Sequence, residues 1–162
     1  MNKNRSLNII AILHNEKNQI LTIKKKLGPN KNHLSLPCVF INFKERIEDI
    51  LKREVDEKLS LIIEPLDILG VYSYFKDNKN EVVISIAFVC LIIDYYAKEK
   101  DDDYDDKKNI EKTQKERKVG ETCWIDLKNI SKSEFAYDHK MIIEDYLNWR
   151  NNKCTFWSSK LR

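Results

Sequence analysis

An apolar run from Val82 to Ile93, interrupted only by Ser85, sets the first limit on the fold. The run is too short for a transmembrane helix, which needs about 20 apolar residues. It is rich in β-branched side chains and apolar at successive positions, which is typical of a strand buried on both faces. We therefore expect a strand over Glu81–Asp94, in a sheet that is covered on both sides.

Two helices and several further strands complete the predicted domain. The further strands are Leu7–Leu13, Gln19–Lys25, Leu61–Ile63, Leu66–Tyr74 and Thr122–Leu127. The polar residues 15–18 separate the first two, so we expect these to pair as a β-hairpin. Apolar residues at three- and four-residue steps predict helices over Arg46–Leu59 and His139–Arg150, the second capped by Asp138. This order predicts one domain over residues 1–162, of α/β (α+β) class, with a mixed β-sheet sandwiched between helices.

The charge of the chain argues against a dedicated nucleic-acid site. Its 29 Lys and Arg and 26 Asp and Glu leave a net charge of +3, without the strong basic excess of nucleic-acid binders. Charged residues concentrate in residues 97–119, where an Asp-rich stretch precedes a Lys-rich one. This segment has almost nothing to bury, so we expect a mobile, solvated loop inserted in the domain.

The cysteines and the C-terminal tail bear on location and assembly. The four cysteines are scattered and form no C-x-x-C pair; they are Cys38, Cys90, Cys123 and Cys154. This pattern disfavours a zinc site or a disulfide framework and predicts reduced thiols in a cytoplasmic protein. The tail carries Phe156 and Trp157, which we expect either to dock on the domain or to form a contact in a homodimer.

One carboxylate lies on the wrong side of the first predicted helix. With Ile47 as the zero of the helical wheel, Glu54 falls at about −20°, inside the apolar stripe, and Glu57 falls at about −80° on its flank. An ionised carboxylate among Ile and Leu side chains costs several kcal/mol unless a cation or a set of donors meets it. Three arrangements satisfy this requirement, and the periodicity leaves all three open.

The first arrangement is a divalent metal that bridges Glu54 and Glu57, because Mg²⁺ prefers oxygen ligands. The second is an internal ion pair between Glu54 and Lys58, which follows it by four residues. The third is a rotated helix, which would place Glu54 at the solvent edge.

Around this helix the sequence resembles the motif of the Nudix family, G-x5-E-x7-R-E-U-x-E-E-x-G-U, in which U is a bulky aliphatic residue. The residues at matching spacings are Glu45, Arg53, Glu54, Val55, Glu57 and Leu61. Three positions depart from the motif: Val39 and Ser60 stand where it has glycine, and Lys58 replaces its last glutamate. Leu36-Pro37 is similar to the lead-in that usually precedes the motif.

Two further segments resemble the ADP-ribose pyrophosphatase-like branch of that family. Residues 76–79 and the following strand Val82–Phe88 are similar to its R-D-P-R turn and strand. Phe135-Ala136-Tyr137-Asp138-His139 resembles the L-A-F-D-H opening of its last helix. The three segments occur in the family's order, so the resemblance implies the Nudix fold from about residue 7 to about residue 150.

The resemblance also implies roles for individual residues. Glu45 and Arg53 would form a structural ion pair, and Glu54 and Glu57 would ligate Mg²⁺ (or Mn²⁺), with Glu57 also catalytic. Lys58 stands where the motif has a third metal ligand, but its ammonium cannot ligate a metal ion. We therefore take Lys58 as a candidate substrate-binding residue.

The implied reaction is metal-dependent hydrolysis of the pyrophosphate in an ADP-ribose-like nucleoside diphosphate. Such chemistry commonly needs a loop glutamate as base, for which Glu121 is the first candidate and Glu116 the second. Tyr72 and Tyr74 are candidates to stack on the nucleotide base, or else fill the core. The alternative reading is a catalytically impaired Nudix-fold module that binds nucleotides or regulates, which the departures at Val39, Lys58 and Ser60 favour.

Overall fold

The structure is a computed structural model, and it describes residues 5–28, 30–41, 44–76, 81–95 and 120–158. The strands are β1 (Arg5–Leu13), β2 (Gln19–Lys24), β3 (Leu34–Ser35), β4 (Cys38–Phe40), β5 (Leu61–Lys76), β6 (Glu81–Tyr95), β7 (Glu121–Asp126) and β8 (Phe156–Ser158). The helices are α1 (Ile47–Leu59), the 3₁₀ helix η1 (Leu127–Lys132) and α3 (His139–Asn152). The segment 97–119, expected to be a mobile loop, lies outside the described residues.

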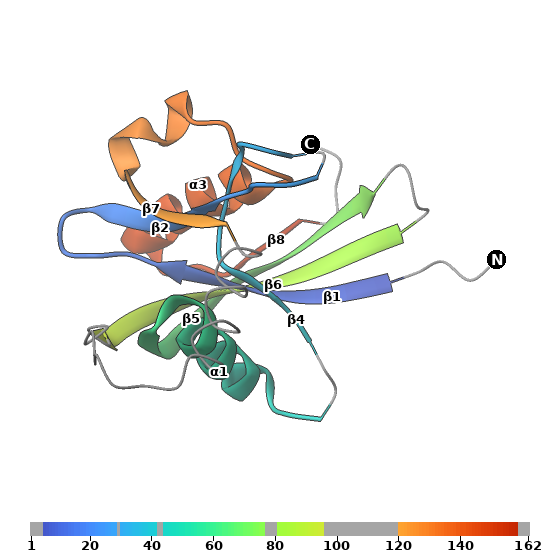
Figure 1. The fold of residues 1–162 in the computed structure, drawn as a ribbon. Helices are drawn as coiled ribbons and strands as arrows, with labels where there is room; N and C mark the ends of the chain where they lie inside the picture. The colour runs from blue at the N-terminus through green and yellow to red at the C-terminus, as the bar shows by residue number, and fades with distance from the viewer. Residues whose placement is uncertain (1–4, 29, 42–43, 77–80, 96–119, 159–162) are drawn as a thin grey trace, which may run out of the picture.

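The strands form two sheets. A five-stranded mixed sheet has the order β4-β1-β6-β5-β8, in which β1 pairs with β6 and β5 with β8 in parallel. A three-stranded sheet has the order β3-β2-β7, with both pairings antiparallel. Figure 1 shows α1 on one side of the larger sheet and α3 on the other. The predicted class, a mixed sheet between helices, is confirmed, with the difference that a second small sheet is present.

Two apolar cores lie on the two faces of the larger sheet. On one face, Ile10 and Ile12 of β1 pack in a cluster with α3, η1 and Ile20 of β2. On the other face, Ile9 and Ala11 of the same strand pack in a cluster with α1. Alternate residues of β1 therefore serve opposite cores, as the two-residue period of a strand requires.

The central strand β6 matches the apolar run that predicted it. It pairs with β1 on one side and with β5 on the other, so it has no free edge over its central residues. Val83, Ala87 and Val89 are buried, whereas Leu91 and Ile93 near the end of the strand are 45% and 56% exposed. The centre of the strand is therefore buried on both faces, whereas its last residues are exposed.

The predicted hairpin between the first two strands is wrong. β1 and β2 share only an isolated bridge between His14 and Ile20, and β2 pairs instead with β7, about 100 residues later in the chain. The turn does close as expected, because Asn15 donates its backbone N–H to the carbonyl of Gln19. Each strand is apolar on both faces, so its pattern specifies burial but not its partner.

The predicted cap of the last helix is also wrong. Asp138 is the N-cap residue of α3 by position, but its side chain makes no capping hydrogen bond, and both carboxylate oxygens are buried without a partner among the described residues. The preceding residue, Tyr137, has a positive φ of 58°, which turns the chain sharply into the helix. Burial raises the pKa of the Asp138 carboxyl above its ordinary value.

The C-terminal tail docks on the domain. β8 adds to the larger sheet beside β5, with Gly70 opposite Phe156 and Val71 opposite Trp157. A Cβ atom at Gly70 would collide with the backbone carbonyl of Phe156, so this close approach requires glycine. Of the two expectations for the tail, docking is the one present. No helix in the described part of the chain is long and apolar enough to cross a membrane.

Candidate active site

Helix α1 carries the residues of the candidate site, and its apolar stripe fixes how the helix is rotated against the sheet. Ile50, Leu51 and Val55 are buried against the sheet, which turns Glu54 toward the edge of that contact. The helix ends at Ser60, whose backbone has the left-handed conformation (φ 54°) and whose N–H bonds to the carbonyl of Asp56. This is the C-cap that glycine adopts most readily, here adopted by serine.

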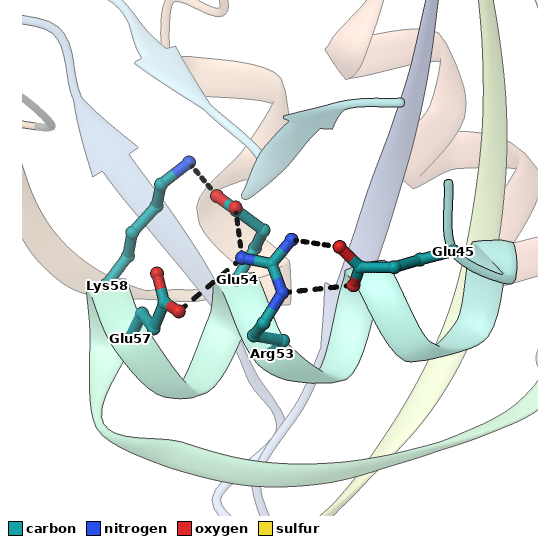
Figure 2. Close-up of polar contacts among 5 residues, drawn as sticks. All are labelled: Glu45, Arg53, Glu54, Glu57 and Lys58. Carbon is teal, nitrogen blue, oxygen red and sulfur yellow. Dashed lines mark hydrogen bonds and ion pairs between the residues drawn. The ribbon is translucent and has the colours of Figure 1, made fainter. Parts of the chain in front are cut away.

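Arg53 is the centre of a cluster of ionic contacts (Figure 2). Its Nε lies 3.1 Å from Glu45 Oε2 and its Nη2 lies 3.3 Å from Glu45 Oε1, so the guanidinium and the carboxylate meet as two forks. Its Nη1 lies 2.8 Å from Glu54 Oε1 and 3.4 Å from Glu57 Oε1. Arg53 therefore ties the loop before the helix to two carboxylates on the helix itself.

Glu54 meets two cations at once. Besides Arg53, Lys58 Nζ lies 2.6 Å from Glu54 Oε2, and the Glu54 side chain is only 20% exposed. Burial raises the pKa of the Glu54 carboxyl, but the hydrogen bonds and charges of Lys58 and Arg53 outweigh it, so the pKa lies below its ordinary value. Of the three arrangements that the sequence left open for Glu54, the structure contains the ion pair with Lys58.

The carboxylates fit an open metal site rather than a closed cage. Among the described residues, no group of three or more His, Cys, Asp or Glu side chains is placed to hold a metal ion. Glu54 and Glu57 both contact Arg53 Nη1, so their oxygens lie on one side of the helix. Mg²⁺ is commonly bound by one or two carboxylates, with water and substrate phosphate as its other ligands. Two carboxylates suit a metal ion whose coordination a phosphate ligand completes.

Two adjoining cavities lie beside these helices, the first against α1 and the second against the start of α3. The first, which we call the helix cavity, has a volume of about 210 Å³, and its lining includes Lys25, Leu36, Cys38, Glu54, Val55 and Lys58. The second, the strand cavity, has a volume of about 200 Å³, and its lining includes Asn8, Lys25, Tyr74, Ser85, Tyr137 and His139. They share Lys25, Ser35 and Cys38, so one elongated ligand could occupy both.

Of the two tyrosines that could stack on a base, only Tyr74 reaches a cavity. Its ring stacks on Tyr137, with the ring centroids 5.4 Å apart, and the hydroxyl of Tyr137 accepts a hydrogen bond of 2.7 Å from Lys25. Tyr72 is fully buried, and its hydroxyl donates to Asp145 at 3.0 Å. A stacking platform must be accessible to its ligand, so the expectation for Tyr72 is wrong and it is a core residue.

Of the two candidate bases, Glu121 is the one that the structure describes, and it does not line the cavity beside Glu54. Glu121 is the first residue of β7, where it is exposed and lines a separate cavity with Lys24 and Glu134. It does not line the helix cavity, so the structure does not bring it together with Glu54. Glu116 lies outside the described residues.

His139 at the start of α3 has a structural role. It is 4% exposed, and its Nδ1 accepts a hydrogen bond of 2.9 Å from the backbone N–H of Leu36. Burial lowers the pKa of His139 to about 4, so the imidazole is neutral near pH 7. This bond joins the start of α3 to the loop that lines both cavities.

Two buried polar residues of the strand cavity were not identified from the sequence. Asn8 of β1 and Ser85 of β6 are 7% and 2% exposed, and Asn8 Oδ1 has no hydrogen-bond partner among the described residues. The available signal was their position as polar residues within otherwise apolar runs. A buried polar atom without a partner is uncommon and marks a place where a ligand atom could bind.

The comparisons with known proteins agree with this geometry. The family description "NUDIX domain" matches residues 4–146. A curated ADP-ribose pyrophosphatase of Methanocaldococcus jannaschii is 34% identical over 134 residues, which are 83% of this chain and 69% of that protein. A NUDIX hydrolase from Nitrosomonas europaea has a similar structure, with a TM-score of 0.68, 13% identity and coverage of 97% of this chain and 100% of the other. An ADP-ribose pyrophosphatase from Streptococcus suis aligns with a TM-score of 0.62, 13% identity and coverage of 94% and 96%.

Proposed function

This chain belongs to the NUDIX domain family, and we propose that it hydrolyses the pyrophosphate bond of a nucleoside diphosphate linked to a second group, with ADP-ribose as the first candidate substrate. The observation that carries the proposal is the pair of adjoining cavities, one beside Glu54 and Lys58 and the other beside the stacked ring of Tyr74. The charged cavity suits the diphosphate, and the cavity with aromatic and hydrogen-bonding groups suits a nucleoside.

In this proposal, Glu54 and Glu57 hold Mg²⁺ or Mn²⁺ together with the substrate phosphates. When bound, such an ion neutralises the pyrophosphate and makes a water molecule more acidic. Glu45 and Arg53 fix the loop before α1 against the helix, so that the carboxylates keep one orientation. Glu121 remains the candidate base, and its place on β7 requires that it act through water or after a movement of that strand's end.

The test is a hydrolysis assay with a panel of substrates. ADP-ribose, NADH, dinucleoside polyphosphates and nucleoside triphosphates are each incubated with Mg²⁺ or Mn²⁺, and the products are separated by chromatography. We expect ADP-ribose to give AMP and ribose 5-phosphate. Glu54→Gln and Glu57→Gln should lower kcat, whereas Asp56→Asn, on an exposed position of the same helix, should not. Absence of hydrolysis across the panel, including at alkaline pH, would refute the proposal.

A second candidate function is a binding or regulatory module without catalysis. The observation that favours it is the engagement of Glu54 by both Lys58 and Arg53, which opposes metal binding there. This function predicts nucleotide binding without turnover and with little dependence on metal. A calorimetric titration of Mg²⁺ in the presence of a non-hydrolysable ligand separates the two functions. Lys58→Glu separates them further, because it restores a third carboxylate and should raise both metal affinity and turnover only in an enzyme.

The proposal extends to location and assembly. The four cysteines are free in the structure, which supports a reducing compartment such as the cytoplasm. A homodimer remains a prediction, and size-exclusion chromatography with light scattering would test it. The modest net charge supports a small-molecule substrate over a nucleic acid.

A further inference from the structure

Lys58 differs from an ordinary surface lysine because it lines the helix cavity and is paired there. It lies in the last turn of α1, and its ammonium contacts Glu54 at 2.6 Å while both residues line the cavity. Its side chain is 33% exposed and belongs to the cavity lining, and the contact with Glu54 holds its ammonium in place. An ammonium group has three N–H donors, of which Glu54 needs one.

The charged residues of the helix cavity do not cancel. Its lining holds two cations, Lys25 and Lys58, and one anion, Glu54, which leaves a net charge of +1. Burial raises the pKa of the Cys38 thiol to about 11, so this neighbour adds no negative charge at pH 7. Lys25, Lys58 and Cys38 all line this one cavity, so the two lysines belong to the same lining.

Lys25 keeps its charge available to a ligand. Its Nζ donates to the hydroxyl of Tyr137, which is a neutral partner, and it lines both cavities. Lysine binds phosphate as a compact point charge, without the fixed geometry of a guanidinium. Two lysines around one cavity are therefore suited to the oxygens of a diphosphate.

We propose that Lys58 is a resident cation of the helix cavity, which binds the diphosphate of a ligand directly, so that this binding does not require a divalent metal ion. The inference rests on the proposed function only for the choice of a diphosphate as ligand. Lys58 stands where the family motif has a glutamate. A carboxylate that would ligate a metal ion is therefore replaced by an ammonium that is itself positively charged. A metal ion would then be needed for turnover and not for binding.

The experiment is isothermal titration calorimetry with inorganic pyrophosphate and with ADP-ribose, in buffer that contains EDTA. Wild type should bind both without metal, and rising salt should weaken the binding because the contact is ionic. Lys58→Gln should bind at least tenfold more weakly. Lys52→Gln is the matched control, because Lys52 lies on the same helix and pairs with Glu64 outside the cavity, and it should bind like wild type.

A double variant separates direct contact from neutralisation of Glu54. In Glu54→Gln/Lys58→Gln the cavity lining regains the net charge of wild type, and no unpaired carboxylate is left. If Lys58 contacts the phosphates, the double variant should still bind several-fold more weakly than wild type. If Lys58 only neutralises Glu54, the double variant should bind like wild type, and the inference is overturned. Thermal melts of each variant confirm that it is folded.

The remaining outcomes distinguish this inference from the proposed function. Pyrophosphate binding in EDTA that depends on Lys58, without hydrolysis of any substrate, supports the inference and refutes the enzyme. Hydrolysis with metal, but no binding of either ligand in EDTA, supports the enzyme and overturns the inference. Equal binding by wild type and Lys58→Gln overturns it as well.

Discussion

Tyr72→Phe tests whether this tyrosine belongs to the core or to the ligand site. Tyr72 lies on β5 with its side chain fully buried, and its hydroxyl donates to Asp145 of α3 at 3.0 Å. Asp145 is itself only 5% exposed, so water cannot replace the lost donor without a rearrangement. Phenylalanine fills the same space, so the change removes a hydrogen bond without making a large cavity.

The expected loss of stability follows from what is left unpaired. A hydrogen bond to a charged group contributes about 1.5–3 kcal/mol, and a buried acceptor that loses its donor costs about 1–3 kcal/mol. We therefore expect Tyr72→Phe to lower the free energy of unfolding by about 1.5–3 kcal/mol. For a chain of this length, each kcal/mol corresponds to about 2–4 °C in Tm.

Urea titrations followed by tryptophan fluorescence measure the free energy of unfolding, and ligand affinity is measured on the same samples. Tyr74→Phe is the matched control, because the Tyr74 hydroxyl has no hydrogen-bond partner among the described residues and the ring still lines the strand cavity. It should change stability by less than about 0.5 kcal/mol. A Tyr72→Phe protein with unchanged stability and weakened ligand binding would show that the core assignment of Tyr72 is wrong.

Three further predictions concern the loop, the tail and the site. Gly70→Ala places a methyl group against the carbonyl of Phe156, so we expect β8 to detach, with faster proteolysis of the tail and a loss of about 1–3 kcal/mol in thermal melts. Burial lowers the pKa of His139 to about 4 in the folded chain, from the ordinary value of 6.5. Between these two pH values the unfolded chain therefore binds up to one more proton at this residue than the folded chain does. Stability should therefore fall as the pH drops below 6.5, by roughly 1 kcal/mol per pH unit from this residue, and urea titrations across pH 5–8 should show a shallower slope in His139→Asn. Arg53→Lys should lower the free energy of unfolding by less than about 1 kcal/mol, because Glu45 and Glu57 are over a third exposed and Glu54 keeps its contact with Lys58. The same change should lower kcat at least tenfold in the hydrolysis assay, because it loosens the loop before α1.

The elements of the fold were predictable where one period dominates the sequence. The structure has a strand at Glu81–Tyr95 where the apolar run predicted Glu81–Asp94, and a helix at Ile47–Leu59 where the pattern predicted Arg46–Leu59. The pairing of β2 with β7 was not predictable, because alternation of side chains states which face is buried and not which strand lies alongside. Tyr72 and Tyr74 lie two residues apart on one face of β5, so both received one interpretation from the sequence. They differ in what covers them, because Tyr72 is fully buried whereas Tyr74 lines the strand cavity.

Part of the ionic cluster on α1 was predictable from the sequence. The family resemblance implied the pair of Glu45 and Arg53. The periodicity left the pair of Glu54 and Lys58 as one of three arrangements. The helical wheel identified Glu54 as misplaced within an apolar stripe, and the structure places it 20% exposed at the edge of that stripe. A wheel gives angles on one helix, so it cannot show that Arg53 reaches Glu45 in the preceding loop as well as two carboxylates on the helix. Those contacts depend on side-chain conformations that only the packed structure fixes.

The three departures from the family motif are of different kinds. Ser60 keeps the left-handed C-cap of α1 without glycine, so the helix still ends where the motif would end it. Val39 lies in β4, 3% exposed and opposite Ile9, where an apolar side chain adds to the core beneath α1. Both residues therefore fit the local structure of this chain. Lys58 alone changes the chemistry of the site, because it exchanges a negative charge for a positive one at the wall of the cavity, and the choice between enzyme and binding module depends on that exchange.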